Sequence, residues 1–485
     1  MHTLFAFILL QVNLLFPPDS LINHHEREAA DFPKIESVKL ICKPDDKVVA
    51  GITLIGNAKT RESILLRELL FSENDTINKE QLLTLIEKSK INLMNTGLFH
   101  SAEINYIENG DGSINVVILV SERWYLWPFP IVELADRNFN AWWLTKDLSH
   151  VNIGMYLIKV NFRGNKESIV LRFKWGFTRQ VGLNYNIPFI NKNQRLGMGF
   201  FANYSRNKQI ILSTVNNKLI FYDKIQDYVR REFNGGVTVN YRKGFYVSQS
   251  FTAKYTHTSI TDTIKFANPL YLGPNLNTLQ FITLEYGLKN DKRDYKPYPL
   301  KGSYCDLLLS HNSFPFKLNY PLNMTTLTMS YRKYSNWSDR IYAATMIKGK
   351  VSSPGFQPFY VQRGLGYFGD YVRGYEYYAF DGQHFVLNKS SLKYNLVKAN
   401  KFNINALKNT GFATFRYAFY LDAFVDGGYV LDKQFDSYNK YTNQLQLGSG
   451  IGLDFLTSND LVIRFEYSIN KFAEHAFYLH AGAPF

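Results

Sequence analysis

Cysteine is nearly absent from this chain. The 485 residues include two, Cys42 and Cys305, which lie far apart. Two distant cysteines give neither the dense, even spacing of a disulfide framework nor the paired spacing of a zinc site. The sequence therefore indicates no disulfide scaffold, no metal site and no cofactor, and both cysteines are interpreted as isolated small hydrophobic residues.

Long apolar runs are also missing. No stretch approaches the 18 or so residues that a membrane-spanning helix requires. A shorter apolar segment, Leu4 to Phe16, ends at Pro17-Pro18 and has the length of a secretory signal core, so we expect a signal peptide over residues 1–20. The alternative is a buried N-terminal segment. If the chain lies in a membrane, it must cross with strands that close into a barrel.

Concentrated positive charge is lacking as well. Lys and Arg outnumber Asp and Glu by 55 to 41, but the basic residues stand singly between apolar ones. Phosphate tracking needs a concentrated patch, so we expect no nucleic-acid partner. Polar positions of a barrel wall and loops that face anionic lipid headgroups account for the same charge.

Catalytic constellations are not apparent either. No serine or cysteine stands in a recognisable nucleophile motif, and the histidines are scattered. We therefore expect that the chain is not an enzyme. The histidines considered are His150, His257, His311, His384, His475 and His480.

What the sequence does have is alternation and aromatic residues. It contains 33 Tyr and 38 Phe, and apolar and polar residues alternate from Ile131 to Phe485 without a sustained helical period. At roughly 22 residues per strand and connection, this segment accommodates about 16 strands. The pattern predicts a mainly β protein with a transmembrane antiparallel barrel over residues 131–485. A soluble pair of β-sandwiches should expose fewer Phe and Tyr.

Two stretches show the alternation most clearly. In each, an aromatic-rich face stands opposite a charged face, as a wall between lipid and a wet lumen requires. The first sets Leu461, Ile463, Phe465, Tyr467 and Ile469 against Arg464, Glu466, Ser468 and Asn470, and the second sets Phe415, Tyr417, Phe419, Leu421 and Val425 against Arg416, Asp422 and Asp426.

A different pattern precedes this segment, within residues 34–122. Strand, helix, helix, strand and strand follow one another, which predicts a small α+β domain with helices on one face of a three-stranded sheet. We expect Thr60 to cap the first helix and Asn78 the second. The expected strands are Val48–Ile55, Ala102–Ile107 and Ile114–Val120, and Gly97 is expected to end the second helix.

An aromatic segment joins the two parts. Amphipathic rings prefer the membrane-water boundary, so we expect the periplasmic interface here. The alternative is a small hydrophobic plug between two soluble domains. The rings are Trp124, Tyr125, Trp127 and Phe129, separated by Pro128 and Pro130.

The small domain resembles a POTRA domain in three landmarks that occur in the family's order. The resemblance implies a periplasmic module whose sheet edge can accept an extended client as an added strand. A mere spacer is the alternative. The landmarks are Gly56-Asn57-Ala58-Lys59-Thr60, Thr96-Gly97-Leu98-Phe99 and Val120-Ser121-Glu122-Arg123.

The barrel segment resembles the BamA/TamA outer-membrane assembly superfamily, also called the bacterial surface antigen family. One landmark is a strand-turn signature and another is a Val-Arg-Gly-Tyr sequence between Gly355 and Phe385. The resemblance implies that this stretch folds back into the lumen, where its arginine meets acidic residues. The signature residues are Asp291, Arg293, Asp294, Pro299 and Gly302, and the loop motif is Val372, Arg373, Gly374 and Tyr375.

An arginine withdrawn from water needs a carboxylate partner. The alternation turns Asp426 inward, so we expect Asp426 to be the partner of Arg373, with Asp454 as second choice. Gly448, Gly450 and Gly452 lie on the side of Asp454, where missing side chains leave room for a loop. Lys393 stands where the family often has glutamate, which leaves open whether one or two carboxylates hold the arginine. The alternative is that Arg373 is a solvated surface-loop residue.

The C-terminus resembles a barrel-assembly signal through Phe477, Leu479, Gly482 and Phe485. Pro484 removes a hydrogen-bond donor and is tolerated mainly at edges, which suggests an imperfect seam between the first and last strands. In the superfamily, that seam is the proposed gate for clients.

These resemblances imply assembly, insertion or translocation of polypeptides. The implied location is the cell outer membrane, with the N-terminal domain in the periplasm. The implied partners are client outer-membrane or translocated proteins, outer-membrane lipid and further assembly subunits. A passive porin or a structural accessory barrel subunit is the alternative.

Overall fold

The computed structural model describes residues 46–134, 142–143, 146, 148, 151–191, 193, 195–222, 228–243, 246–294, 297–313, 323–367, 369–403, 414–457 and 462–482. The expected signal peptide, residues 34–45 of the expected small domain, and Leu461, Pro484 and Phe485 lie outside these ranges. No helix in the described ranges is long and apolar enough to cross a membrane.

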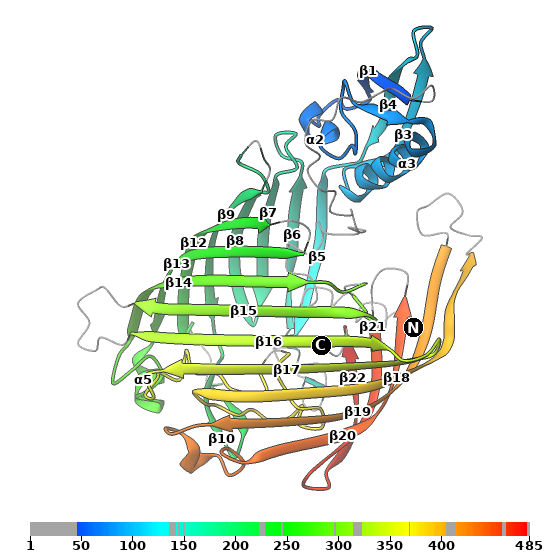
Figure 1. Ribbon diagram of the computed structural model, residues 1–485. Coiled ribbons are helices and arrows are strands. Elements are labelled where there is room, and N and C mark those ends of the chain that lie inside the picture. Colours follow the sequence, from blue (N-terminus) through cyan, green and yellow to red (C-terminus); the bar gives the residue numbers. More distant parts are fainter. Residues whose placement is uncertain are drawn as a thin grey trace.

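The small N-terminal domain is an α+β unit, as the sequence predicts (Figure 1). Its sheet has the strand order β2-β1-β4-β3, with β1 and β4 parallel and the other pairs antiparallel. Helix α3 packs on β3 and β2. The elements are β1 (Asp46–Ile55), α2 (Glu62–Leu66), β2 (Thr76–Asn78), α3 (Lys79–Asn95), β3 (Phe99–Glu108) and β4 (Ser113–Glu122).

Two expectations for this domain are wrong. The sheet has four strands rather than three, because the short strand β2 pairs antiparallel with β1. Three residues are too few to show a period of two in the sequence. The N-cap of α2 is Arg61 rather than Thr60. Asn78 is the N-cap of α3, as expected, and its side chain accepts from the Glu80 amide at 3.0 Å.

An apolar core holds the small domain together. Leu82, Ile86 and Leu93 lie on one face of α3, and they pack against alternate residues of the sheet such as Val116 and Ile118. This spacing at positions i, i+4 and i+11 follows the helical period. Burial of these aliphatic side chains gives the domain its own hydrophobic core.

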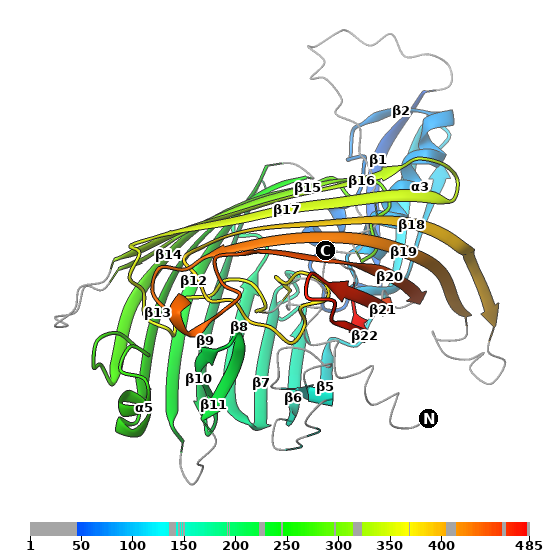
Figure 2. The same cartoon turned by 90° about the horizontal axis from the view of Figure 1, so that it is seen from below.

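The second unit is an antiparallel sheet of 16 strands that curls into a barrel, which confirms the expected fold class (Figures 1 and 2). Sequential strands pair throughout, except that β9 pairs with β12 across an inserted hairpin. The strands are β5 (Leu126–Leu134), β6 (Val151–Val160), β7 (Ser168–Gly176), β8 (Thr178–Ile187), β9 (Leu196–Asn207), β12 (Arg230–Lys243), β13 (Val247–Ile260), β14 (Thr278–Asp291), β15 (Gly302–Ser313), β16 (Met324–Asn336), β17 (Ile341–Ser353), β18 (His384–Asn403), β19 (Thr414–Leu431), β20 (Leu445–Thr457), β21 (Val462–Asn470) and β22 (His475–Ala481).

The two alternating stretches have the expected phase where they are described. On β21, Phe465, Tyr467 and Ile469 are exposed, whereas the residues between them are buried. On β19, Leu421 and Val425 are exposed and Asp422 and Asp426 are fully buried. The charged faces therefore point into the barrel and the apolar faces point out, as a membrane wall requires.

The barrel end away from the small domain is covered by chain from several connections. The hairpin of β10 (Ile210–Val215) and β11 (Lys218–Tyr222) lies inside the curve of the sheet, as does the 354–383 loop (Figure 2). Asn217 at the hairpin turn is fully buried. Its backbone oxygen accepts from Ala379, and its amide nitrogen donates to Asn439, both at 2.8 Å. Short elements α5 (Asp262–Ala267) and η4 (Asp436–Tyr438) complete this end.

Besides the covalent connection, hydrogen bonds attach the small domain to the turn between β6 and β7 of the barrel. The Asn161 amide group donates to the Thr60 hydroxyl at 2.8 Å, and Thr60 donates to Glu122 at 2.6 Å. The Arg61 amide donates to the Gly164 carbonyl at 3.0 Å. Tyr125 is buried beside Thr60, and burial raises the pKa of its phenol. Thr60 is thus part of a buried junction between the two units.

Candidate functional site

The candidate site is the place where the loop between β17 and β18 meets the inner wall of β18 to β22. Arg373 of this loop is fully buried. The interpretation of Arg373 as a solvated surface residue does not fit this position, because its guanidinium lies among acidic side chains.

Asp426 binds Arg373 in bidentate geometry. The guanidinium donates from Nε to Oδ2 at 2.8 Å and from Nη2 to Oδ1 at 2.7 Å. The Arg373 backbone amide also donates to Oδ2 at 3.1 Å. Charge-assisted bonds of this kind fix the orientation of both groups. The expected pair therefore lies in direct contact.

A second carboxylate and a ring complete the surroundings of Arg373. Nη1 lies 3.3 Å from Oδ2 of Asp422 and 3.8 Å from Oε1 of Glu466. The guanidinium carbon lies 3.8 Å from the ring centroid of Phe424, which is a cation-π distance. The sequence left open whether one or two carboxylates hold the arginine. The structure places two within hydrogen-bonding distance.

A glycine on β20 makes room for the loop. A Cβ atom at Gly448 would lie 1.9 Å from the Arg373 carbonyl oxygen, so no side chain fits there without displacing the loop backbone. The missing side chain at this position of β20 leaves room for the loop backbone. Gly450 and Gly452 face neighbouring strands instead, where the nearest atoms belong to Tyr467 and Glu466.

The other motif residues pack around the arginine. Val372 and Tyr375 are buried in an aromatic and aliphatic cluster with Tyr378 and Phe380. Gly374 has a φ of +94°, a conformation that glycine adopts without strain. Its amide donates to Oε2 of Glu376 at 2.9 Å, so the motif turns sharply and directs Glu376 inward.

Asp454 is not the partner of Arg373. It accepts from the Tyr298 hydroxyl at 2.6 Å and from the Lys393 ammonium at 3.3 Å. The second-choice expectation is therefore wrong. The reason is the register: Asp454 lies opposite Tyr420 on β19, farther along the strand than Asp422 and Asp426.

The strand-turn signature lies at the end of the barrel that carries the small domain. Arg293 donates to Asp291 through Nε and Nη2 at 2.8 Å each, and the Leu300 amide donates to Asp294 at 3.1 Å. Gly302 has a φ of +109° and approaches the Lys292 carbonyl closely. Pro299 follows Tyr298, which reaches Asp454. The turn thus sends one aromatic side chain into the lumen.

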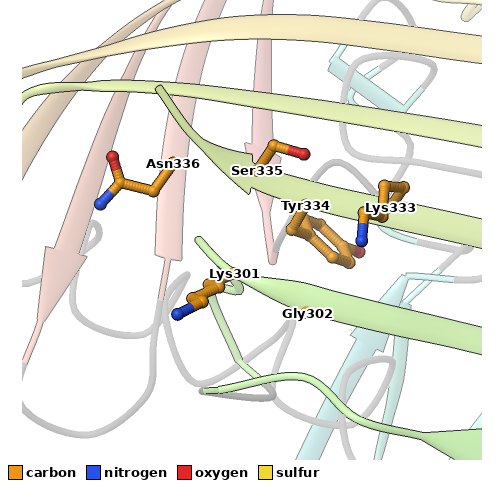
Figure 3. Close-up of a pocket in the computed structure, with 6 residues that line it drawn as sticks. All are labelled: Lys301, Gly302, Lys333, Tyr334, Ser335 and Asn336. Atoms are coloured by element: carbon orange, nitrogen blue, oxygen red, sulfur yellow. The ribbon is translucent and has the colours of Figure 1, made fainter. Parts of the chain in front are cut away.

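A pocket borders this signature where β15 begins and β16 ends (Figure 3). It is separate from the Arg373 contacts, since none of its residues bonds to Arg373 in the described structure. Its lining is Lys301, Gly302, Lys333, Tyr334, Ser335 and Asn336.

The last strand meets the same loop. On β22, the ring of Tyr478 is tilted against that of Tyr377 with centroids 5.4 Å apart, and His480 stacks on Tyr371 at 5.7 Å. Phe477 points outward with 79% of its surface exposed, and Leu479 is half-buried. Gly482 follows the strand with a φ of +104°. The loop therefore contacts both the acidic wall and the final strand.

In the described ranges the sheet order begins at β22 and ends at β5, so these two strands border the seam. Val160 donates to the Tyr125 carbonyl, which fixes the phase of the β5 to β6 ladder. Even-numbered residues of β5 consequently direct their backbone groups away from β6. Pro128 and Pro130 occupy two of these positions and supply no N–H there.

Sequence reasoning missed several members of the site as partners. Asp422 and Glu466 were placed on the inward faces but not assigned to Arg373. Tyr298 and His480 gave no local signal, because their partners lie 156 residues away for Tyr298 and in the loop for His480. Alternation could have identified Asp422, since it shares the phase of Asp426.

Comparisons with known proteins agree with this architecture. Residues 47–123 match the POTRA family, described as surface antigen variable number repeat, and residues 161–485 match the Omp85 superfamily domain. A search of curated proteins found no match. Among solved structures, BamA from Haemophilus ducreyi lacking POTRA domains 1-3 is similar at a TM-score of 0.59 and 16% identity, over 90% of this chain and 84% of that one.

Two further structures are similar at lower TM-scores. CdiB from Escherichia coli has a TM-score of 0.46 and 10% identity, over 93% of this chain and 92% of that one. CdiB from Acinetobacter baumannii has a TM-score of 0.49 and 11% identity, over 90% and 74%. Because the Omp85 match spans more than half of the sequence, the chain belongs to the Omp85 superfamily, whose members are non-enzymatic assembly and transport proteins.

Proposed function

We propose that this chain inserts or translocates client polypeptides at the outer membrane, with its small domain in the periplasm. The observation that carries the proposal is a strand at the end of the sheet order of the described residues, together with a loop that ion pairs hold inside the barrel. The strand is β5, and the loop is held through Arg373. A client strand needs free backbone groups to pair with, and an edge strand presents them.

The prolines of β5 support this proposal. Two consecutive outward-facing backbone positions, Pro128 and Pro130, lack a donor. A seam with fewer hydrogen bonds separates more easily than the other strand pairs of the barrel. The expectation of a weak seam based on Pro484 lies outside the described residues, but β5 supplies an independent reason.

A passive porin is the rival function. A porin needs an open aqueous lumen. Here the 354–383 loop and the β10–β11 hairpin lie within the curve of the sheet, and Asn217 ties them together (Figure 2). We infer that conductance is low while the loop is latched. Steady conductance of the unmodified protein in planar bilayers would favour the porin.

The small domain is proposed to receive clients before they reach the seam. Strands β2 and β3 form the edges of its sheet, where an extended segment could add. We take residues 34–122 as this domain and 131–485 as the barrel, although β5 begins ahead of the latter bound, at Leu126. The proposed partners are client proteins, outer-membrane lipid and other assembly subunits.

The domain assignment has its own test. Deletion of residues 47–122 should leave a barrel with heat-modifiable migration on a gel but without client capture by crosslinking. Asn161 would lose its partner Thr60, so the matched control is Thr60→Val in the full chain. If the deletion abolished the folded barrel while Thr60→Val did not, the two segments would form one cooperative unit.

Locking the seam tests the function itself. In a background with Cys42→Ser and Cys305→Ser, cysteines replace Val132 on β5 and Leu479 on β22. Disulfide formation, checked by non-reducing migration, should block client assembly, and a reductant should restore it. The control places cysteines at Leu171 and Leu183, which already face each other on paired strands. Full activity of the oxidised seam variant would overturn lateral opening.

A further inference from the structure

Three buried side chains from separate elements converge beside the Arg373 contacts. Glu376 comes from the loop, Glu466 from β21 and His480 from the last strand, β22. One potential ligand atom of each lies within 4.8 Å of the other two. His480 and Glu466 are buried to more than nine-tenths of their side-chain surface. The cluster therefore joins the loop to the final two strands.

The distances within the cluster suit a small ion between the groups. Nε2 of His480 lies 3.2 Å from Oε2 of Glu466 and 3.5 Å from Oε1 of Glu376. Nitrogen and oxygen ligands bind Zn²⁺ at about 2.0 to 2.2 Å, which places tetrahedral ligands roughly 3.3 to 3.6 Å apart. The two distances from Nε2 of His480 are thus close to the edges of such a tetrahedron, and all three ligand atoms lie within 4.8 Å of one another.

The contacts around the ligand atoms orient them toward one another. Nδ1 of His480 lies 3.3 Å from the Tyr371 hydroxyl, which leaves Nε2 facing the carboxylates. Oε1 of Glu466 accepts from Arg464 at 2.6 Å, and Oε2 of Glu376 accepts from Gly374. Second contacts of this kind fix ring orientation and tautomer at metal sites.

By hydrogen-bond geometry neither Nε2 of His480 nor Oε2 of Glu466 has a partner, although the two atoms lie 3.2 Å apart, an ion-pair distance if His480 is protonated. If Nδ1 carries the ring proton, the Nε2 lone pair faces carboxylate oxygens directly. That arrangement is repulsive in a buried site unless a positive charge lies between the atoms.

The balance of buried charges around the cluster also favours a bound positive charge. Among the described residues, the buried carboxylates on the inner wall of β18 to β22 and in the loop number six, against four buried cations, so negative charge is in excess when His480 is neutral. Arg464 and Arg373 reduce the attraction for a further cation but do not cancel it. The carboxylates are Glu376, Asp381, Asp422, Asp426, Asp454 and Glu466, and the cations are Arg373, Lys389, Lys393 and Arg464.

We propose that Glu376, Glu466 and His480 form a binding site for a divalent transition-metal ion of the Zn²⁺ class. One imidazole and two carboxylates are the ligand set of several zinc sites, whereas Mg²⁺ and Ca²⁺ prefer oxygen ligands alone. Cysteine spacing in the sequence could not indicate this site, since it contains no cysteine and its ligands are far apart in the chain.

A bound ion would fasten the inserted loop to the strand that borders the seam. His480 lies on β22, the strand at one end of the sheet order in the described ranges. The ion would act beside the Arg373 contacts, which hold the loop to β19. The metal site does not depend on the proposed assembly function, because binding can be measured on the isolated protein.

Direct binding tests the site. The purified, tag-free, full-length chain in detergent micelles is stripped with EDTA and titrated with Zn²⁺ against a competing dye. We expect one equivalent to bind, and Mg²⁺ not to compete. Glu376→Gln and His480→Ala should each weaken binding at least tenfold, whereas His475→Ala, on the same strand but exposed, should not.

A spectroscopic measurement separates metal binding from a structural role. Co²⁺ bound by the chain should give the visible absorption of a four-coordinate site, and His480→Cys should retain it with a shifted band, because a thiolate also binds such ions. If the stripped wild-type chain binds no Zn²⁺ or Co²⁺, the proposal is wrong and His480 is a protonated partner of the two carboxylates. Equal binding by the Glu376→Gln, His480→Ala and wild-type chains would place the metal elsewhere.

Discussion

The small N-terminal domain and the barrel lumen bury different chemistry. In the small domain, α3 and the sheet enclose aliphatic side chains such as Leu82 and Ile118. In the lumen, Arg373, Asp422 and Asp426 are equally buried but charged. Burial of apolar surface is favourable in itself, whereas a buried charge is tolerated only beside its partner.

This difference shows which buried contacts require one specific partner residue. An aliphatic core tolerates exchanges that conserve volume, so it defines a fold without requiring one exact partner for each residue. The lumenal contacts are pairwise and directional. The loop can leave the wall only if Arg373 and its carboxylates separate together and become solvated, which makes the loop suited to two discrete positions.

The largest expected effect comes from breaking the lumenal pair. Arg373→Ala strands buried carboxylates, and removal of one member of such a pair costs about 3 to 5 kcal/mol. A double-mutant cycle with Asp426→Ala, read by denaturant unfolding and by protease cleavage of the loop, should show strong non-additivity. Lys79→Ala is the control, because Lys79 and Glu108 form an ion pair in which both side chains are exposed, and it should change stability far less. Additive, near-neutral effects would contradict the view that Arg373 and its carboxylates hold the loop inside the barrel.

The corresponding substitution in the small domain removes an apolar side chain, so its expected effect comes from lost burial and not from an unpaired charge. Leu82→Ala removes a fully buried side chain from α3 and should destabilise the domain by about 2 to 5 kcal/mol. Hydrogen exchange of the α3 amides measures this, while the heat-modifiable migration of the barrel should stay unchanged. Leu83→Ala, at a side chain that is 62% exposed, is the control. Loss of the folded barrel in Leu82→Ala would show that the two regions unfold together.

A smaller effect is expected where the loop backbone meets β20. Gly448→Ala places a methyl group against the Arg373 carbonyl, and overpacking of this kind costs about 1 to 3 kcal/mol. Residues 354–383 should become more sensitive to protease. Gly427→Ala is the control, because its added Cβ would have an ordinary contact of 3.6 Å with Leu447. Equal protection in both variants would mean that the loop is not seated against β20.

The two regions also differ in how far the sequence predicted them. Helix and strand periods predicted the small domain well, except for β2, which is too short to show a period. Alternation predicted the barrel, the strand number and the inward phase of Asp426. These features depend on residues close together in the chain.

The composition of the candidate site depended on distant residues and was harder to predict. Asp422 and Asp426 share one phase, so phase alone could not tell which carboxylate meets Arg373, and Asp454 was a reasonable second choice until strand register was known. Tyr298 reaches Asp454 from a turn that looked unremarkable. His480 gains its role only because the loop brings Glu376 to it.

A change in stability no larger than that at Gly448 should come from the seam, and it sharpens the comparison because it involves neither apolar burial nor charge. Pro128→Ala with Pro130→Ala returns two N–H groups to the outer edge of β5. If each finds a carbonyl on β22, the closed barrel gains about 0.5 to 1.5 kcal/mol per hydrogen bond.

The added hydrogen bonds should slow opening of the seam without disturbing the folding of the barrel. We expect the double variant to have a higher unfolding midpoint and reduced client assembly, measured with the same assay as the seam disulfide. Val132→Ala is the matched control, because it alters a side chain on the same edge but already has its N–H. Unchanged assembly together with a raised midpoint would show that the seam closes without being the route for clients. An unchanged midpoint would mean that the β5 edge stays unpaired even when its donors are restored, so the prolines would not be what keeps the seam weak.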